Sequence, residues 1–286
     1  MVVCVVVNWN GWQDTLACLE TLTRQTSLPL HVVVVDNGST DESVARLQAW
    51  MDLHHAEPVT FLLLRSEGNL GFARGANLGI RWALQHDADF VWLLNNDTEC
   101  PPDTLAKLLR TAQASSSTGA VGTVLFYHSN PTQVQAWGGG RVSRWTGTTT
   151  HFLKPSALGS DAYLTFASVL IRASVFQDVG LLYDAYFMYY DDSDFCLRLS
   201  KTRWKLAVAA DTAVLHKESA SSEGPRDPFM ERTIAVSGMR FLLRHSPVPS
   251  LSIPVFLLLK LLNRARRGEW AAVRAVWQAV AVLRKP

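Results

Sequence analysis

"HVVVVDNGSTDESVARLQAW", residues 31–50, contains one complete strand, turn and helix pattern. A run of β-branched residues at 31–35 is followed by a polar cluster and then by a segment with helical spacing at 40–51. Short, continuous apolar runs of this kind are typical of strands buried in a parallel sheet. Ser39 and Glu42 have the spacing of a capping box, which predicts that the helix begins just after Ser39.

The same pattern recurs through the first 100 residues. Further apolar runs lie at 2–7, 59–64 and 90–94, and further helical patterns lie at 14–24 and 72–86. Strands that alternate with helices in this way form βαβ units around a mostly parallel central sheet. We therefore predict a Rossmann-like α/β fold for this part of the chain.

The composition is that of an ordered globular protein, with 48% hydrophobic and 18% charged residues among 286. Residues 260–286 contain seven Lys or Arg and one acid, whereas residues 1–259 contain 20 basic and 24 acidic residues. A weakly acidic body argues against nucleic acid as its partner, and the basic tail favours an anionic one.

Cysteines and apolar runs indicate the compartment. The four cysteines are scattered without a CxxC pair, which indicates a reduced compartment and no zinc site. The apolar run at 2–7 has no basic residues before it, so we expect a strand and no signal peptide. The apolar stretch at 251–262 is too short for a bilayer, which needs about 20 residues.

Each of the first four apolar runs ends in a polar cluster. These clusters are Asn8-Trp9-Asn10-Gly11, Asp36-Asn37-Gly38-Ser39, Gly68-Asn69-Leu70-Gly71 and Asn95-Asn96-Asp97. The carboxyl ends of parallel strands share one edge of the sheet, and ligands bind along that edge. A single cluster is explained equally well by a turn, but four together favour a ligand site. The sequence has neither a GxGxxG fingerprint after the first run nor a GxxxxGK[ST] loop, which excludes a P-loop NTPase.

Five segments carry a family resemblance. They are "VVVDNGSTDES" (33–43), "GNLGFARGANLGI" (68–80), "VWLLNNDT" (91–98), "VGLLYDAYFMYYDDSDFCLRL" (179–199) and "VLHKESASS" (214–222). In this order they resemble family 2 glycosyltransferases, and in particular the rhamnosyltransferase-like branch. The resemblance covers about residues 2–245. It implies a GT-A fold and inverting transfer of a sugar from a nucleoside diphosphate sugar to a hydroxyl group.

The resemblance also implies roles for individual residues. Asn95-Asn96-Asp97 is similar to the metal motif of the family, so Asp97 and His216 would hold Mn²⁺ or Mg²⁺. The residues expected at the nucleotide sugar are Asn8, Asn10, Asp36, Asn69, Gly71, Arg74 and Asn96. For Asp36 an Asx-turn is the alternative interpretation.

The acidic segment after Tyr190 resembles the catalytic motif. Asp192 matches the family's general base, which takes a proton from the attacking hydroxyl group, and Asp191 replaces the family's Glu. Asp194 has the spacing to pair with Arg198 on a helix that runs to about Ser200, which indicates a structural role.

Three aromatic residues bear on where a sugar would bind. Phe166 occupies a position where the family often has Gly, which predicts a reshaped sugar pocket. Trp137 and Trp145 flank a loop or short hairpin at 137–151, where sugar stacking and core packing are equally good interpretations.

We expect a catalytic domain at 1–246, with a nucleotide-binding half at 1–100 and an acceptor and catalytic half at 101–246. The three prolines of 240–254 predict a linker, and residues 247–286 would form basic amphipathic helices. The periodic apolar positions of this tail are Trp270, Val273, Val276, Trp277, Val280 and Leu283. Two interpretations stay open, namely contact with an anionic membrane surface and packing on the domain or another subunit.

The favoured function is transfer of L-rhamnose from dTDP-rhamnose to a glycan or lipid-linked glycan in cell-surface polysaccharide synthesis. The alternatives are a UDP-hexose or UDP-N-acetylhexosamine transferase and a catalytically silent sugar-nucleotide-binding or glycan-binding subunit. A nucleotidyltransferase is disfavoured, because "VVNWNGWQD" has no basic glycine-rich loop for a triphosphate. The expected location is cytoplasmic and peripheral on the inner face of the cytoplasmic membrane.

Overall fold

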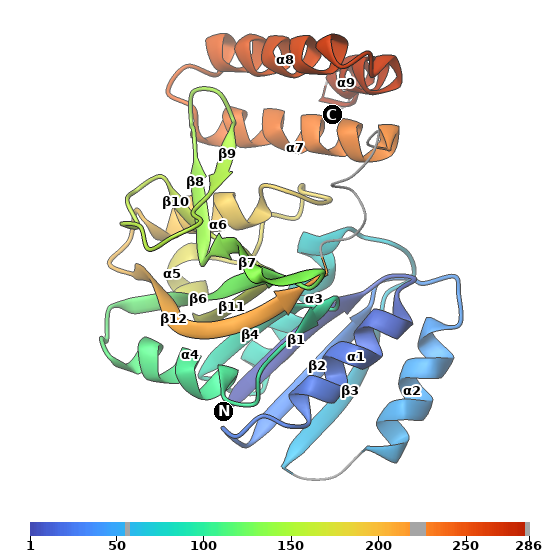
Figure 1. Cartoon of the computed structure of the whole chain (residues 1–286), viewed down its shortest axis with the longest axis vertical. Coiled ribbons are helices and arrows are strands. Elements are labelled where there is room, and N and C mark those ends of the chain that lie inside the picture. The colour runs from blue at the N-terminus through green and yellow to red at the C-terminus, as the bar shows by residue number, and fades with distance from the viewer. Residues whose placement is uncertain (55–57, 218–226, 284–286) are drawn as a thin grey trace.

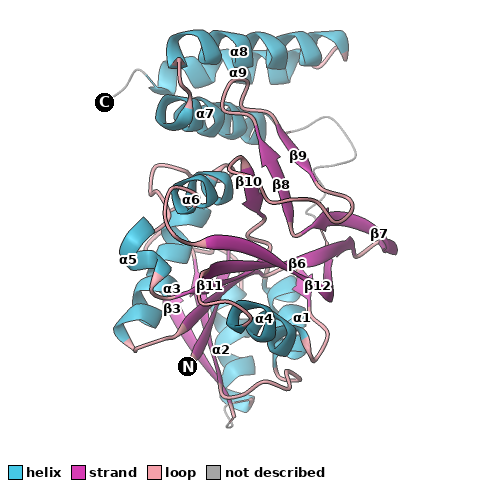
Figure 2. Ribbon diagram, turned by 90° about the vertical axis from the view of Figure 1, so that its left-hand side faces the viewer, coloured by secondary structure: helices cyan, strands magenta, loops and turns pink. Residues whose placement is uncertain are grey.

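The computed structural model describes residues 1–54, 58–217 and 227–283. These residues form a large mixed sheet with helices on both faces, a small second sheet, and a layer of C-terminal helices (Figures 1 and 2). The strand order of the large sheet is β3-β2-β1-β4-β11-β6-β12-β5, and β7 pairs with β6. Its strands are β1 (Val2–Asn8), β2 (Leu30–Asp36), β3 (Val59–Arg65), β4 (Phe90–Asn95), β5 (Thr98–Glu99), β6 (Thr118–Tyr127), β7 (Asn130–Trp137), β11 (Ser168–Arg172) and β12 (Lys205–His216).

The first four strands confirm the predicted parallel sheet. β1 pairs in parallel with both β2 and β4, and β2 pairs in parallel with β3. β11 runs antiparallel between β4 and β6, which makes the sheet mixed. The helices of this region are α1 (Trp12–Leu22), α2 (Ser43–Leu53), α3 (Phe72–Gln85), α4 (Thr104–Gln113), α5 (Val175–Val179) and α6 (Asp191–Leu199).

Both faces of the sheet are buried, which explains the continuous apolar runs. Along β1, Val3 and Val5 belong to the core under α3, whereas Cys4 and Val6 belong to the core under α1, α2 and α4. A strand that is covered on both faces has no solvent side, so it needs no alternating polar residues.

The prediction that this helix begins just after Ser39 was wrong. Helix α2 begins at Ser43, whose backbone N–H donates to Asp41 Oδ1 at 2.9 Å. The hydroxyl group of Ser39 instead accepts hydrogen bonds from Asn8 Nδ2 and from the backbone of Asn10. The side chain of Ser39 is therefore used in contacts between the polar turns after β1 and β2, and it does not cap the helix.

The small sheet has the order β10-β8-β9, formed by β8 (Gly139–Val142), β9 (Thr149–His151) and β10 (Ala162–Leu164). β8 and β9 form an antiparallel hairpin, which agrees with the hairpin alternative at 137–151. In Figure 1 this hairpin reaches from the central sheet to the C-terminal helices. At its tip, Gly147 lies against the ring of Phe256, whose helix belongs to that layer.

The C-terminal layer consists of α7 (Pro228–His245), α8 (Pro249–Arg266) and α9 (Trp270–Leu283). The prediction of a linker at 240–254 was wrong. Helices α7 and α8 occupy this segment, apart from the three residues that connect them. Pro249 lies in the first turn of α8, where the missing N–H group has no intrahelical partner to lose. Within the described ranges, no helix combines the length and apolar content that a transmembrane span requires.

Buried ion pairs hold this layer together. Glu231 on α7 is fully buried, and its carboxylate lies 2.8 Å from Arg264 and 3.7 Å from Lys260 on α8. Arg264 also pairs with Glu269 at 2.7 Å. Part of the basic charge of the tail is thus neutralised inside the protein.

Candidate active site

The carboxyl ends of β1 and β2 are joined by side-chain hydrogen bonds. Asn8 Nδ2 donates to Asp36 Oδ1 at 2.9 Å, and Asn8 Oδ1 accepts from Thr15 Oγ1 at 2.7 Å. Asp36 Oδ2 accepts from the backbone N–H of Ser39 at 3.1 Å, a local turn contact that is one residue longer than an Asx-turn. Asn8 and Asp36 are 0% and 2% exposed, and their predicted contact with the nucleotide stays a prediction.

The next turn is held by asparagine side chains. Asn69 Oδ1 accepts from Asn37 Nδ2 and from the backbone of Gly71, which leaves Asn69 as a loop-forming residue. Asn10 is exposed in a left-handed conformation (φ 49°), and its Oδ1 accepts from the backbone of Thr40 at 2.8 Å. Arg74, in the first turn of α3, is also exposed.

Gly71 joins this edge to the acidic segment. Its φ of 80° is in the left-handed region, and a Cβ there would lie 2.3 Å from the carbonyl oxygen of Phe187. The adjacent backbone N–H of Phe72 donates to the same carbonyl oxygen at 2.7 Å. Only glycine permits this approach, which brings the segment before Asp191 against the loop that follows β3.

The two predicted metal ligands lie together. His216 Nε2 is 3.2 Å from Asp97 Oδ1, and both side chains are slightly exposed at 13% and 15%. Burial would raise the pKa of Asp97, but the hydrogen bond and charge of His216, together with Lys217, outweigh it and lower that pKa. The side-chain amide of Asn96 donates to Thr15 Oγ1 at 3.0 Å, so this amide is engaged with α1.

This pair fits a divalent cation. Two donor atoms bound at right angles to one cation, with bonds of about 2.1 Å, are about 3 Å apart. One carboxylate oxygen and one imidazole nitrogen suit Mn²⁺ or Mg²⁺, with Mn²⁺ the better match for imidazole. No set of three His, Cys, Asp or Glu converges in the described part of the chain, so diphosphate oxygens and water would have to complete the coordination.

The predicted catalytic carboxylates begin α6. Both residues before them, Tyr189 and Tyr190, have positive φ angles of 69° and 64°. Two consecutive bulky residues in this region are strained, and such strain is concentrated at functional sites. The hydroxyl group of Tyr190 donates to the carbonyl of Gly147 at 2.6 Å, which ties this turn to the tip of the β8–β9 hairpin.

Burial raises the pKa of both carboxylates. The pKa of Asp191 is raised by burial and by the charge of Asp192. Burial also raises the pKa of Asp192, although the backbone and hydroxyl group of Ser193 donate to its Oδ1 at 2.6 and 3.1 Å and oppose the shift. A carboxylate with a raised pKa is a stronger base than an ordinary one, which suits proton removal from a hydroxyl group.

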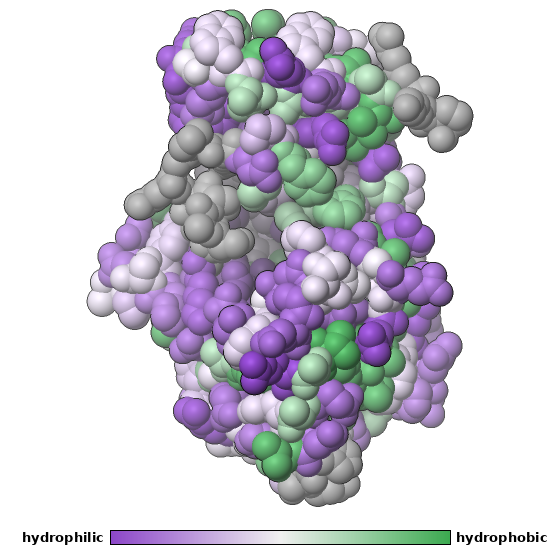
Figure 3. All heavy atoms as spheres, turned by 90° about the vertical axis from the view of Figure 1, so that its right-hand side faces the viewer, coloured by the Kyte–Doolittle hydropathy of each residue, from purple (hydrophilic) through white to green (hydrophobic). Residues whose placement is uncertain are grey.

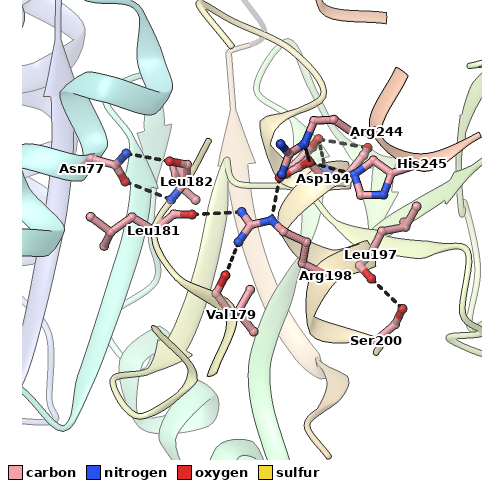
Figure 4. Close-up of polar contacts among 12 residues, drawn as sticks. Asn77, Val179, Leu181, Leu182, Asp194, Leu197, Arg198, Ser200, Arg244 and His245 are labelled. Atoms are coloured by element: carbon pink, nitrogen blue, oxygen red, sulfur yellow. Dashed lines mark hydrogen bonds and ion pairs between the residues drawn. The ribbon is translucent and has the colours of Figure 1, made fainter. Parts of the chain in front are cut away.

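Asp194 anchors the acidic helix, as Figure 4 shows. It is fully buried and accepts from Arg198 (2.8 Å), Arg244 (2.9 Å) and His245 (2.7 Å). Burial would raise its pKa, but these three donors lower it to about 2. The predicted pairing with Arg198 is confirmed, and the partners on α7 extend it into a network.

Phe166 lies in the core, and its effect on the sugar pocket stays a prediction. Its ring is 4% exposed and packs edge-on against Phe195 at 5.8 Å, so it belongs to the core. Trp145 lies at the hairpin tip and is 52% exposed, whereas Trp137 is partly buried at the end of β7.

Four site residues had no sequence signal. Thr15 joins Asn8 to Asn96, and Gln135 Oε1 lies 2.8 Å from His216 Nδ1. Arg244 and His245 bind Asp194 from α7. Gln135, Arg244 and His245 come from elements distant in sequence from their partners, and Thr15 joins Asn8 to the distant Asn96, so spacing alone could not identify them.

Residues 3–180 match the profile of glycosyl transferase family 2, which is well over half of the chain. The low-salt glycan biosynthesis hexosyltransferase Agl10 of Haloferax volcanii is 26% identical over 226 residues, covering 75% of this chain and 66% of that protein. The N-acetylglucosaminyl-diphospho-decaprenol L-rhamnosyltransferase of Mycobacterium tuberculosis is 28% identical over 249 residues, covering 78% of each chain.

A solved structure shows the same fold. The mannosyltransferase PcManGT of Pyrobaculum calidifontis, in complex with GDP-Man and Mn²⁺, superposes with a TM-score of 0.62 at 18% identity. The match covers 98% of this chain and 74% of that one. The GT-A fold implied by the sequence is thus confirmed, and the chain belongs to glycosyltransferase family 2.

Proposed function

We propose that this chain transfers a sugar, with inversion, from a nucleoside diphosphate sugar to a hydroxyl group of a glycan or lipid-linked glycan. The observation that carries the proposal is the contact of Phe187 with Gly71 and Phe72, which holds the segment before Asp191 against the loop that follows β3. The Asp97–His216 pair lies on the nucleotide edge, and Asp191 and Asp192 begin the helix that follows Phe187.

The Asp97–His216 pair and the Asp191–Asp192 pair would have different chemical roles. A bound divalent cation would neutralise the negative charge that builds up on the leaving diphosphate. Asp97 and His216 would hold that cation, together with oxygens of the diphosphate itself. Asp192 would take the proton of the acceptor hydroxyl group as it attacks the sugar from the opposite side. Burial and the charge of Asp192 raise the pKa of Asp191, so Asp191 holds its proton more readily and leaves Asp192 as the ionised carboxylate.

The first-choice donor is dTDP-L-rhamnose, and the product would enter a cell-surface polysaccharide. The name of the mycobacterial relative supports this choice, whereas the archaeal hexosyltransferase supports a UDP-hexose or UDP-N-acetylhexosamine as the alternative. Identities of 26–28% are compatible with either donor.

A panel of nucleotide sugars tests the proposal. Each sugar nucleotide is added with and without Mn²⁺, and the rise in melting temperature reports binding by mass action. Transfer to a lipid-linked or short synthetic acceptor is then measured with the donors that bind. A donor that binds without hydrolysis or transfer would instead support the catalytically silent subunit.

Metal removal gives a direct prediction. Asp97→Ala should weaken Mn²⁺-dependent binding of the nucleoside diphosphate and reduce transfer, because one of two protein ligands is lost. Excess EDTA should have the same effect on the wild-type protein, and added Mn²⁺ should restore its activity. Full activity in EDTA would contradict the metal role of Asp97 and His216.

We also propose peripheral membrane association through the C-terminal helices. Leu251, Leu258 and Leu262 form an exposed apolar stripe on α8, and Trp270 and Trp277 are 68% and 62% exposed on α9. Arg266, Arg267 and Arg274 are exposed beside them. Figure 3 shows apolar and hydrophilic atoms interspersed over this end of the molecule. Such a surface suits the headgroup region of an anionic bilayer.

A further inference from the structure

Gln135 is a buried polar side chain beside the proposed metal pair. It lies on β7 and is only 4% exposed, and its Oε1 is 2.8 Å from His216 Nδ1. β6 lies between β7 and β12 and pairs with both, so the side chains of Gln135 and His216 meet across the end of β6. No local pattern requires a glutamine at this position of a strand.

The contact determines which nitrogen of His216 carries its proton. A carbonyl oxygen only accepts hydrogen bonds, so Nδ1 of His216 must be the donor to Gln135. In the neutral ring, Nε2 then has a free lone pair. That nitrogen lies 3.2 Å from Asn95 Nδ2, a donor, which agrees with an accepting Nε2.

The same nitrogen lies 3.2 Å from Asp97 Oδ1, which has lone pairs only. A proton on Nε2 makes this contact a hydrogen bond, and once that proton is lost the two facing lone pairs favour a shared cation. In metal sites, a ligating histidine generally donates its other ring N–H to a nearby oxygen, which fixes the ring and raises its basicity. Gln135 provides that oxygen here.

We infer that Gln135 is a positioning residue that holds His216 in the Nδ1–H form with Nε2 directed at the cation beside Asp97. The inference rests on the metal role in the proposed function, but it concerns a property of His216 that exists before any metal binds. Gln135 would not touch the sugar nucleotide or the reacting atoms.

Three variants test the inference. Gln135→Leu removes the acceptor, Gln135→Glu keeps one, and Gln133→Leu is the matched control, since Gln133 is exposed on the same strand. ¹⁵N NMR of the imidazole nitrogens, assigned with His216→Gln, reports the tautomer of His216 in the metal-free protein. Electron paramagnetic resonance of Mn²⁺ with UDP or dTDP reports metal affinity, and thermal unfolding checks the fold.

We expect the Nδ1–H tautomer of His216 in the wild-type protein, in Gln135→Glu and in Gln133→Leu. Gln135→Leu should lose this preference and bind Mn²⁺ about 10–100-fold more weakly, the usual cost of removing such a partner. Nucleotide affinity without metal should not change.

The possible results distinguish the role of Gln135 from the proposed metal site. A wild-type His216 in the Nε2–H form, or unchanged Mn²⁺ affinity in a folded Gln135→Leu, would overturn the role of Gln135. If Gln135→Leu does not fold, loss of Mn²⁺ binding in Gln135→Glu despite a native melting temperature would overturn it as well. Failure of the wild-type protein to bind Mn²⁺ with any nucleotide would refute the metal site, while the tautomer measurement would still decide whether Gln135 orients His216.

Discussion

At the residue scale, the buried carboxylates at the start of α6 carry the chemistry that we propose. Asp192→Asn keeps the size and most hydrogen bonds of the side chain but cannot accept a proton. We expect transfer to fall by about 10²–10⁴-fold, with nucleotide affinity close to that of the wild type. Steady-state rates and nucleotide titrations would check both values. Retained activity in Asp192→Asn with loss in Asp191→Asn would assign the base to Asp191 instead.

Asp191→Asn gives a prediction about stability and pH. A carboxyl group whose pKa is raised in the folded state stabilises the protein below the unfolded pKa of about 3.9, and that contribution is lost as the pH rises through the raised value. Asp191→Asn should therefore melt at a higher temperature than the wild type at pH 8, by a few degrees, and the gain should shrink toward pH 4. Differential scanning calorimetry across this range checks the trend. An equal gain at both pH values would show that ionisation of Asp191 is not its cause.

The residue types of the site were predictable from the sequence, but the directions of several side chains were not. Asp97 and His216 lie 3.2 Å apart and Asp191 and Asp192 begin α6, while their roles stay predictions. Asn8 and Asp36 were expected at the nucleotide, yet they are buried and bonded to each other. A motif gives the order of residues at a strand end, whereas the orientation of each side chain depends on partners such as Thr15 from another element.

At the element scale, Asp194 connects α6 to α7, and its removal should loosen that junction. Taking one partner from a buried ion pair costs on the order of 3 kcal/mol, so Asp194→Asn should lower the melting temperature by roughly 6–12 °C at neutral pH. The pKa of Asp194 is lowered to about 2, so its contribution exists above the unfolded value of about 3.9 and is lost as the pH falls toward 2. The gap between the variant and the wild type should accordingly narrow below pH 4. Asp52→Asn on α2, where the exposed carboxylate accepts a hydrogen bond from Gln48, provides a control.

Strands and helices of the first 100 residues were predicted well, and the reason is burial. Each of β1 to β4 is covered on both faces, so its apolar run marks it without reference to the rest of the chain. The linker at 240–254 failed because prolines were interpreted as breaks. Pro249 and Pro254 both lie inside α8, since a first-turn proline loses no hydrogen bond and the packing of Phe256 against Gly238 supports the helix beyond it.

At the scale of the whole molecule, the C-terminal helices are continuous with the rest of the protein. Phe256 on α8 packs against Gly147 of the hairpin and Gly238 of α7, and Arg264 neutralises the buried Glu231. Truncation after Ser246 would remove both residues, so any loss of vesicle binding would be confounded by unfolding. Exposed side chains give a cleaner test of membrane association.

Replacing both Trp270 and Trp277 with Ser should weaken binding to anionic vesicles and leave the melting temperature nearly unchanged, because the two indoles are 68% and 62% exposed. Vesicles of phosphatidylserine and phosphatidylcholine, sedimented with the protein at low and high salt, provide the measurement. Wild-type binding should weaken as salt rises, since each basic residue near the surface contributes about 1 kcal/mol and the attraction fades within about 8–10 Å. Leu53→Ser is the control, because Leu53 is 84% exposed on α2. If the wild-type protein does not bind these vesicles at low salt, the apolar stripe on α8 and the two tryptophans must serve another partner. A second copy of the chain would then be detected by sedimentation equilibrium.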